Sequence, residues 1–171
     1  AVSGVRSRLL PGIQRIHPST KGDVGSPVVV RLLDMSYAGD VTPIETYAAL
    51  AADPDAVLVD VRTTAEWTYV GLPDLASLGK QVVTIEWQRY PSGAVNDRFI
   101  DQLRDAGVEG ERPLYFLCRS GVRSKHAASA ATAAGLGPAY NIVDGFEGPH
   151  DSHQHRAVAG WKVDGLPWRQ G

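Results

Sequence analysis

The one cysteine of the chain, Cys118, stands in a loop sequence that could support nucleophilic chemistry. Arg119 and Arg123 bring positive charge close to the sulfur, and Gly121 allows the backbone to turn tightly. Positive surroundings favour the thiolate, which is the nucleophilic form of cysteine. We therefore expect Cys118 to act as a nucleophile on an anionic substrate.

Two predicted elements position this loop. Leu114–Leu117 is a run of apolar residues directly after Pro113 and predicts a buried strand, whereas the alanine-rich run Ala127–Ala134 predicts a helix. Cys118 then lies in a strand-to-helix turn. The first N–H groups of a helix lack partners within the helix and attract anions, so this position suits an ionised sulfur.

The alternative is that Cys118 is an inert core residue, which is the more common fate of a single cysteine. An inert cysteine has no use for two arginines, a serine and a glycine immediately after it. The sequence context therefore favours catalysis.

A second polar segment follows another predicted strand. Val57–Val59 is apolar and β-branched, as expected of a strand covered on both faces, and Asp60 and Arg62 follow it. Ligands of parallel sheets bind at the carboxyl ends of strands, so this segment can lie beside the Cys118 loop. The alternative for Asp60 and Arg62 is an ordinary surface ion pair.

These segments resemble a known family. Cys118–Arg123 resembles the active-site loop of single-domain rhodaneses, the thiosulfate-type sulfurtransferases, and Val57–Arg62 resembles their Asp-x-Arg segment. The resemblance runs from about Asp40 to Pro167 and includes glycine and tryptophan signals near the end of the chain. It implies an α/β fold, with a single rhodanese-like domain whose open, mainly parallel central sheet carries helices on both faces.

The resemblance also implies a mechanism. The Cys118 thiolate would attack a small anionic, thiosulfate-like sulfur donor, and the resulting persulfide would pass its sulfur to cyanide or a thiol, with a protein as a possible acceptor. The expected substrate-binding residues are Arg119, Ser120, Gly121, Val122 and Arg123. Asp60, Arg62 and Ser124 would support the loop, although Ser124 could instead cap the helix. No metal and no organic cofactor is required.

Two other functions remain open. The chain could be a rhodanese-like binding or regulatory module without turnover, although an inactive module could dispense with Cys118. It could also be a cysteine-dependent phosphatase or arsenate reductase. Four residues separate Cys118 from Arg123, whereas the related phosphatase signature has one more, so the spacing favours sulfur chemistry.

The composition agrees with a soluble globular domain of 171 residues, 43% of them hydrophobic and 21% charged. A net charge of −2 gives no reason to expect nucleic-acid or membrane-surface binding, and no apolar run approaches the length of a membrane span. A single cysteine excludes internal disulfides and fits a reducing compartment, so we expect a cytoplasmic protein.

Residues 1–27 are basic and lack apolar periodicity, which predicts a disordered tail, with a transit peptide or an upstream extension as alternatives. The rhodanese-like domain is then predicted over residues 28–171, with Val28–Val30 as a possible first strand. A helix is expected to begin after Thr42, because Thr42, Pro43 and Glu45 form a typical helix start.

The remaining predictions concern the second half of the chain. We expect a strand at Gln81–Ile85, a helix at Asn96–Gly107 and a last strand at Ala139–Val143. The turn from Asp144 to Pro149 could form a third wall of the site or serve only as a turn.

Several aromatic and histidine residues are predicted to be structural. Trp67 is expected to pack against the core or the rim of the site, and Trp161, Leu166 and Trp168 to anchor the end of the chain. The histidines 150, 153 and 155 are expected in a solvated loop without metal. The family's histidine-containing turn after Glu66 is replaced here by Val70–Leu75, which leaves the substrate range open.

Overall fold

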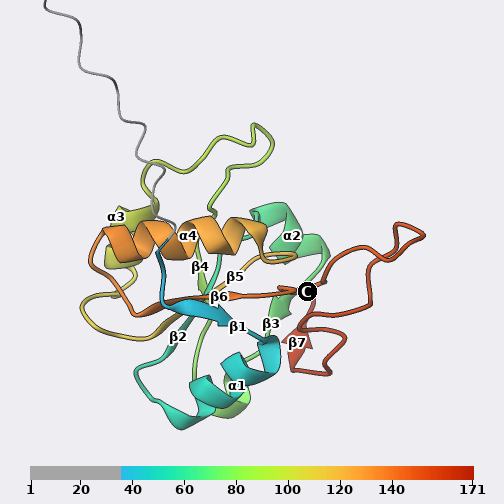
Figure 1. The fold of residues 1–171 in the computed structure, drawn as a ribbon, viewed down its shortest axis with the longest axis horizontal. Helices are drawn as coiled ribbons and strands as arrows, with labels where there is room; N and C mark the ends of the chain where they lie inside the picture. The colour runs from blue at the N-terminus through green and yellow to red at the C-terminus, as the bar shows by residue number, and fades with distance from the viewer. Residues whose placement is uncertain (1–35) are drawn as a thin grey trace, which may run out of the picture. The chain divides into compact units, whose positions relative to one another are not determined.

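The structure is a computed structural model that describes residues 36–171 (Figure 1). The predicted tail over residues 1–27 and the possible strand Val28–Val30 lie outside the described residues. The first described strand, β1 (Gly39–Val41), had no counterpart among the elements expected from the sequence.

A five-stranded parallel sheet forms the centre of the fold, as expected of an α/β protein. The strand order is β1, β6 (Ala139–Ile142), β5 (Leu114–Leu117), β2 (Val57–Asp60) and β4 (Val83–Thr84). All residues of β2 and β5 are buried, which confirms the two predicted central strands. Asp60 pairs with Leu117 in register, so the segment after β2 begins beside Cys118.

Helices cover both faces of this sheet: α3 and α4 lie on one side and α1 on the other (Figure 1). The first core layer joins Phe99 and Leu103 of α3 and the alanines of α4 to Val59 and Phe116. The second layer joins Leu50 of α1 to Leu58 and Leu117 on the opposite face, together with Phe146 and Trp161. Alternate residues of β2 and β5 thus point to opposite layers.

The helix starts follow local sequence signals. The helix α1 (Pro43–Ala52) begins with the predicted capping box of Thr42 and Glu45, and α2 (Thr64–Tyr69) begins with an equivalent box of Thr63 and Glu66. The helix α4 (Val122–Ala133) starts five residues before the predicted alanine-rich run, directly after the Cys118 loop. The helix α3 (Phe99–Asp105) starts three residues later than predicted, because Asn96 hydrogen-bonds Glu86 and Gln102 instead of entering the helix.

The predicted strand Ala139–Val143 is confirmed as β6, but the prediction that it is the last strand was wrong. A strand β7 (Trp168–Arg169) pairs antiparallel with β3 (Leu72–Pro73) in a separate two-stranded sheet. Strands of two residues are too short to show alternation in the sequence. The strand β4 spans only Val83 and Thr84 of the predicted Gln81–Ile85. Trp161 is fully buried, as expected of an anchor, whereas Trp168 is 41% exposed.

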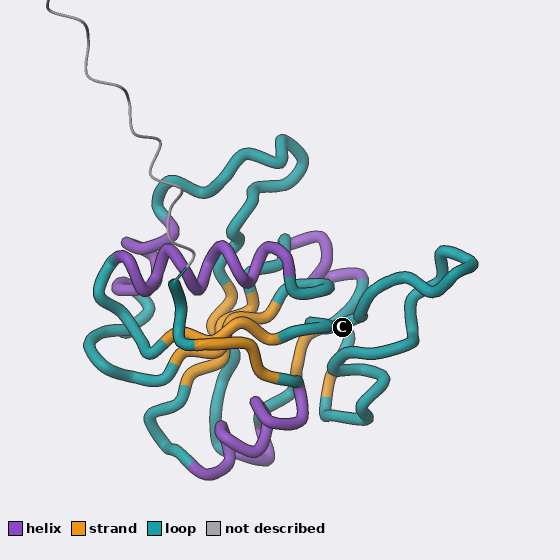
Figure 2. Tube along the Cα trace, viewed as in Figure 1, coloured by secondary structure: helices purple, strands orange, loops and turns teal. Residues whose placement is uncertain are grey.

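A loop over residues 149–159 projects from the domain, as the orange-red segment of Figure 1 and the teal tube of Figure 2 show. Its two ends meet closely, because a Cβ at Gly160 would lie 2.8 Å from the nitrogen of Gly148. Arg156 also donates a hydrogen bond to the Gly148 carbonyl. The three histidines lie in or beside this loop, and among residues 36–171 no three His, Cys, Asp or Glu side chains gather as metal ligands.

Within residues 36–171, no helix has both the length and the apolar character needed to cross a membrane.

Candidate active site

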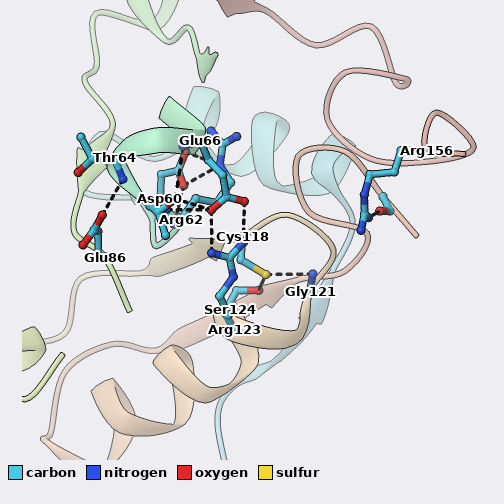
Figure 3. A network of polar contacts seen from close by, with 12 residues as sticks. Asp60, Arg62, Thr64, Glu66, Glu86, Cys118, Gly121, Arg123, Ser124 and Arg156 are labelled. Atoms are coloured by element: carbon cyan, nitrogen blue, oxygen red, sulfur yellow. Dashed lines mark hydrogen bonds and ion pairs between the residues drawn. The ribbon is translucent and has the colours of Figure 1, made fainter. Parts of the chain in front are cut away.

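Cys118 directly follows β5, and its sulfur lies at the start of α4 (Figure 3). The backbone N–H of Gly121 donates to Cys118 Sγ over 3.1 Å. Gly121 is the residue before the helix and has φ of +95°, a left-handed conformation that glycine adopts without strain. Because the N–H at the N-terminal end of the twelve-residue α4 points at the sulfur, the positive end of the helix faces Cys118.

Ser124 is the second group that contacts the sulfur. Its Oγ lies 3.1 Å from Cys118 Sγ and 2.7 Å from Asn141 Oδ1, and the side chain is fully buried. Gly121 occupies the capping position, and the helix start has no side-chain cap. Ser124 therefore packs against the sulfur of Cys118, and the helix-cap alternative is wrong.

Arg123 is held by Glu66 of α2. The two guanidinium NH2 groups donate to the two carboxylate oxygens over 2.8 and 2.7 Å, and both side chains are mostly buried (Figure 3). Burial alone raises the pKa of Glu66, but hydrogen bonds from Arg123 and from the Thr63 backbone outweigh it and lower the pKa to about 2. Burial likewise opposes the charge of Arg123, and the Glu66 carboxylate outweighs it, so that the pKa of Arg123 is raised.

Arg119 is exposed, and among residues 36–171 its side chain has no hydrogen-bond or ion-pair partner. Arg119 and Arg123 border an open cavity of about 470 Å³ together with Tyr90 and Gln88. Cys118 itself is 1% exposed and does not line this cavity. At this cavity, the guanidinium of Arg119 is therefore available to a ligand, whereas that of Arg123 is already paired with Glu66.

Within residues 36–171, the side chains of Ser120 and Val122 form no hydrogen bond with the sulfur. Ser120 is half-buried and forms no side-chain hydrogen bond with the described residues. Val122 is 66% exposed. Their predicted roles in substrate binding, like that of Arg123, stay predictions.

Asp60 and Arg62 form a fully buried ion pair, so the surface-pair alternative is wrong. Arg62 Nη2 donates to Asp60 Oδ2 over 2.6 Å and to the carbonyl of Gly71 over 2.8 Å. The guanidinium carbon lies 4.0 Å from the centre of the Phe146 ring. Removing either partner would leave a buried charge without compensation.

Phe146 belongs to a turn that clasps the Cys118 loop. Its N–H donates to the Cys118 carbonyl over 2.8 Å, and the N–H of Glu147 donates to the Arg119 carbonyl over 3.0 Å. Gly145 approaches so closely that a Cβ there would overlap the Cys118 carbonyl oxygen. The turn therefore packs against the backbone of the Cys118 loop but does not border the cavity, and Phe146 lies between Arg62 and that loop. The predicted role of Asp60 and Arg62 in supporting the loop stays a prediction.

Sequence reasoning missed two further residues. Asn141 of β6 is 3% exposed and donates from Nδ2 to Asp40 Oδ1 over 2.9 Å, so a polar path runs from β1 to Ser124. The signal was an asparagine inside an otherwise apolar predicted strand. Glu66 was noted only for its family position, although Thr63 and Glu66 have the spacing of a capping box.

Comparisons with known proteins agree with this fold. Residues 38–171 match the family described as the STR4 middle domain. An uncharacterised protein of Rickettsia conorii is 38% identical over 125 residues, which make up 73% of this chain and 92% of that protein. The chloroplastic rhodanese-like domain-containing protein 4 of Arabidopsis thaliana is 32% identical over 123 residues, which make up 71% of this chain but 24% of that protein.

Two solved structures are similar. The crystal structure of Rv0390 from M. tuberculosis is 55% identical in sequence with a TM-score of 0.74, covering 80% of this chain and 100% of that one. The polysulfide-sulfur transferase homodimer from Wolinella succinogenes has a TM-score of 0.52 at 21% identity, covering 77% and 78% of the two chains, and supports the fold alone. The family match and these relatives lead to one conclusion: the chain belongs to the rhodanese-like family described as the STR4 middle domain.

Proposed function

We propose that this protein is a sulfurtransferase of the single-domain rhodanese type, in which Cys118 carries sulfur as a persulfide. One observation carries the proposal. The sulfur of Cys118, the only cysteine of the chain, accepts a hydrogen bond from the N–H of Gly121 at the positive end of α4. This is the arrangement in which a thiolate and a persulfide anion are both stabilised.

The reaction has two balanced steps. The Cys118 thiolate attacks the outer sulfur of thiosulfate, the S–S bond of the donor breaks, and sulfite leaves with the bonding electron pair. Cyanide or a thiolate then attacks the outer sulfur of the persulfide, and the Cys118 thiolate is regenerated. No net oxidation or reduction of the protein remains after one cycle.

The charges around the loop fit a small anionic donor. Arg119 is exposed at the cavity and available to donor oxygens, whereas Arg123 adds positive charge that Glu66 fixes in place. Because Arg123 is paired, we assign most of the attraction of thiosulfate to Arg119 and to the helix start. Polysulfide is a second donor worth testing, since the Wolinella neighbour is named for it. A protein acceptor and a cytoplasmic location stay predictions.

A binding module is the second candidate, and one observation favours it. Cys118 is 1% exposed and lies outside the lining of the cavity, so a donor must displace part of the loop to reach the sulfur. A module that only binds a partner would need no such access.

Intact-protein mass spectrometry distinguishes the two functions. Incubation with thiosulfate is expected to add one sulfur atom, and cyanide is expected to remove it. Cys118→Ala serves as the control and should gain nothing. A folded wild-type protein that gains no sulfur from thiosulfate or polysulfide would favour the binding module, and release of phosphate from an aryl phosphate would favour a phosphatase.

A further inference from the structure

A line of close polar contacts connects a carboxylate at the edge of the sheet to the buried sulfur. Asp40 Oδ1 accepts from Asn141 Nδ2 at 2.9 Å, and Asn141 Oδ1 lies 2.7 Å from Ser124 Oγ. Ser124 Oγ in turn lies 3.1 Å from Cys118 Sγ. Strand pairing builds this line, because Asp40 of β1 stands opposite Asn141 of β6. We call it the Asp40–Asn141–Ser124 chain.

Asp40 fixes the orientation of the Asn141 amide. Hydrogen bonds from Asn141 and from Tyr37 lower the pKa of Asp40, so its carboxylate is ionised near neutral pH and can only accept. The NH2 group of Asn141 must therefore face Asp40, and its carbonyl oxygen must face Ser124. The reverse orientation would bring two acceptor oxygens together.

Asn141 in turn fixes the direction of the Ser124 hydroxyl. The geometry allows Ser124 Oγ to donate either to Asn141 Oδ1 over 2.7 Å or to Cys118 Sγ over 3.1 Å, but the hydroxyl has only one proton. Because the amide oxygen only accepts and is the closer partner, we assign this proton to the contact with Asn141. The lone pairs of Ser124 then face the sulfur. In that state the contact with Cys118 is a hydrogen bond only when the thiol S–H donates to Ser124 Oγ, and a thiolate receives no donor from Ser124.

We propose that the Asp40–Asn141–Ser124 chain favours the protonated thiol of Cys118 in the resting protein and so limits the amount of nucleophile. The chain opposes the Gly121 N–H and the start of α4, which favour the thiolate. The outer end of the chain is exposed, because Asp40 is a surface residue. An event at β1 that neutralises the Asp40 carboxylate would therefore remove the preference for the protonated thiol. The inference deepens the proposed function, on which its biological meaning rests.

Other charged groups lie in the loop and in the elements packed around it. Arg123 on α4 interacts with Cys118 and is paired with Glu66 on α2; the other charged residues in or next to the surrounding segments are Arg119, Asp60, Arg62 and Asp144. The decisive variants must therefore leave all of these charges unchanged.

Asn141→Leu and Ser124→Ala meet that requirement, and the ultraviolet absorbance of the thiolate measures the outcome. Cys118 is the only cysteine, so subtraction of the Cys118→Ala spectrum isolates its signal across a pH series. At a fixed pH where the thiol is mostly protonated, Asn141→Leu should contain most thiolate, because its Ser124 is free to donate. Ser124→Ala should be intermediate and the wild type lowest, with roughly 2- to 10-fold between the extremes.

The opposite hydrogen-bond direction gives a different order of thiolate fractions. If Ser124 already donates to the sulfur in the wild type, Ser124→Ala has less thiolate than the wild type and Asn141→Leu has about the same, and this result would overturn the proposal. Should Asn141→Leu fail to fold by circular dichroism, the sign of the Ser124→Ala change still decides.

Asp40→Asn tests the outer end of the chain. It lets the Asn141 amide turn and is expected to raise the thiolate fraction, but it also removes a negative charge. Asp144→Asn is the charge control, since Asp144 lies beside the loop but outside the chain. An equal rise in both variants would refute the role of Asp40. The absorbance needs no sulfur donor, so this test can fail or succeed independently of the mass measurement.

Discussion

Glu66→Gln is expected to destabilise the folded protein by about 2 kcal/mol at neutral pH. Lowering the pKa of Glu66 from 4.5 to about 2 corresponds to roughly 3 kcal/mol of folded-state stability, at about 1.4 kcal/mol per pH unit. The pair with Arg123 is partly reached by solvent, 19% and 17% of the two side chains being exposed, so we reduce that figure to about 2 kcal/mol.

The dependence on pH has a defined sign. Because the folded-state pKa of Glu66 is below its unfolded value, the stabilisation is present above about pH 4.5 and is lost as the pH falls toward about 2. Urea unfolding should show a midpoint about 1 M lower for Glu66→Gln at pH 7, taking a slope of about 2 kcal/mol/M. The two proteins should converge as the solution is acidified.

Glu45→Gln is the matched control. Glu45 has the same place in the capping box of α1, with Thr42 in the role of Thr63, but among the described residues it has no arginine partner. Its substitution should cost less than that of Glu66. An equal cost in both variants, or a Glu66→Gln difference that persists unchanged at low pH, would show that capping and not the ion pair with Arg123 is the source of stability.

Three further tests address other parts of the site. Gly145→Ala should lower the stability by about 2–4 kcal/mol, since its Cβ would overlap the Cys118 carbonyl and φ is +55°; unchanged urea unfolding would contradict the close approach. Arg62→Met should cost about 3–5 kcal/mol by leaving Asp60 charged and buried, and Asp60→Leu in the same chain should recover much of that loss. Arg119→Gln should raise the KM for thiosulfate about two- to fivefold and weaken its dependence on salt, and steady-state kinetics that show neither change would rule out a role for Arg119 in binding the donor.

The sequence predicted the parts of this fold that local patterns control. The apolar runs of β2 and β5 indicated buried strands, and Thr42 with Glu45 marked a helix start. Cys118 with the residues after it indicated a strand-to-helix turn, because glycine and arginines follow an apolar strand. Each of these signals lies within a few consecutive residues.

The contacts that complete the site join residues far apart in the sequence. Glu66 and Arg123 are separated by 57 positions, and Asp40 and Asn141 by 101. Their meeting depends on strand order and on how α2 packs beside α4, which no local pattern encodes. The two-residue pairing of β3 with β7 also depends on the path of the whole chain.

The closed neck of the 149–159 loop has a practical consequence for experiments. Gly148, Gly160 and Arg156 hold the two ends of the loop together, and the histidines at its tip are exposed. Lengthening this loop adds little to the entropic cost of folding, because contacts at its base already hold its two ends together. A fluorescent reporter peptide inserted between His153 and Gln154 should therefore leave the domain folded. It would report the binding of a partner without altering the surroundings of Cys118.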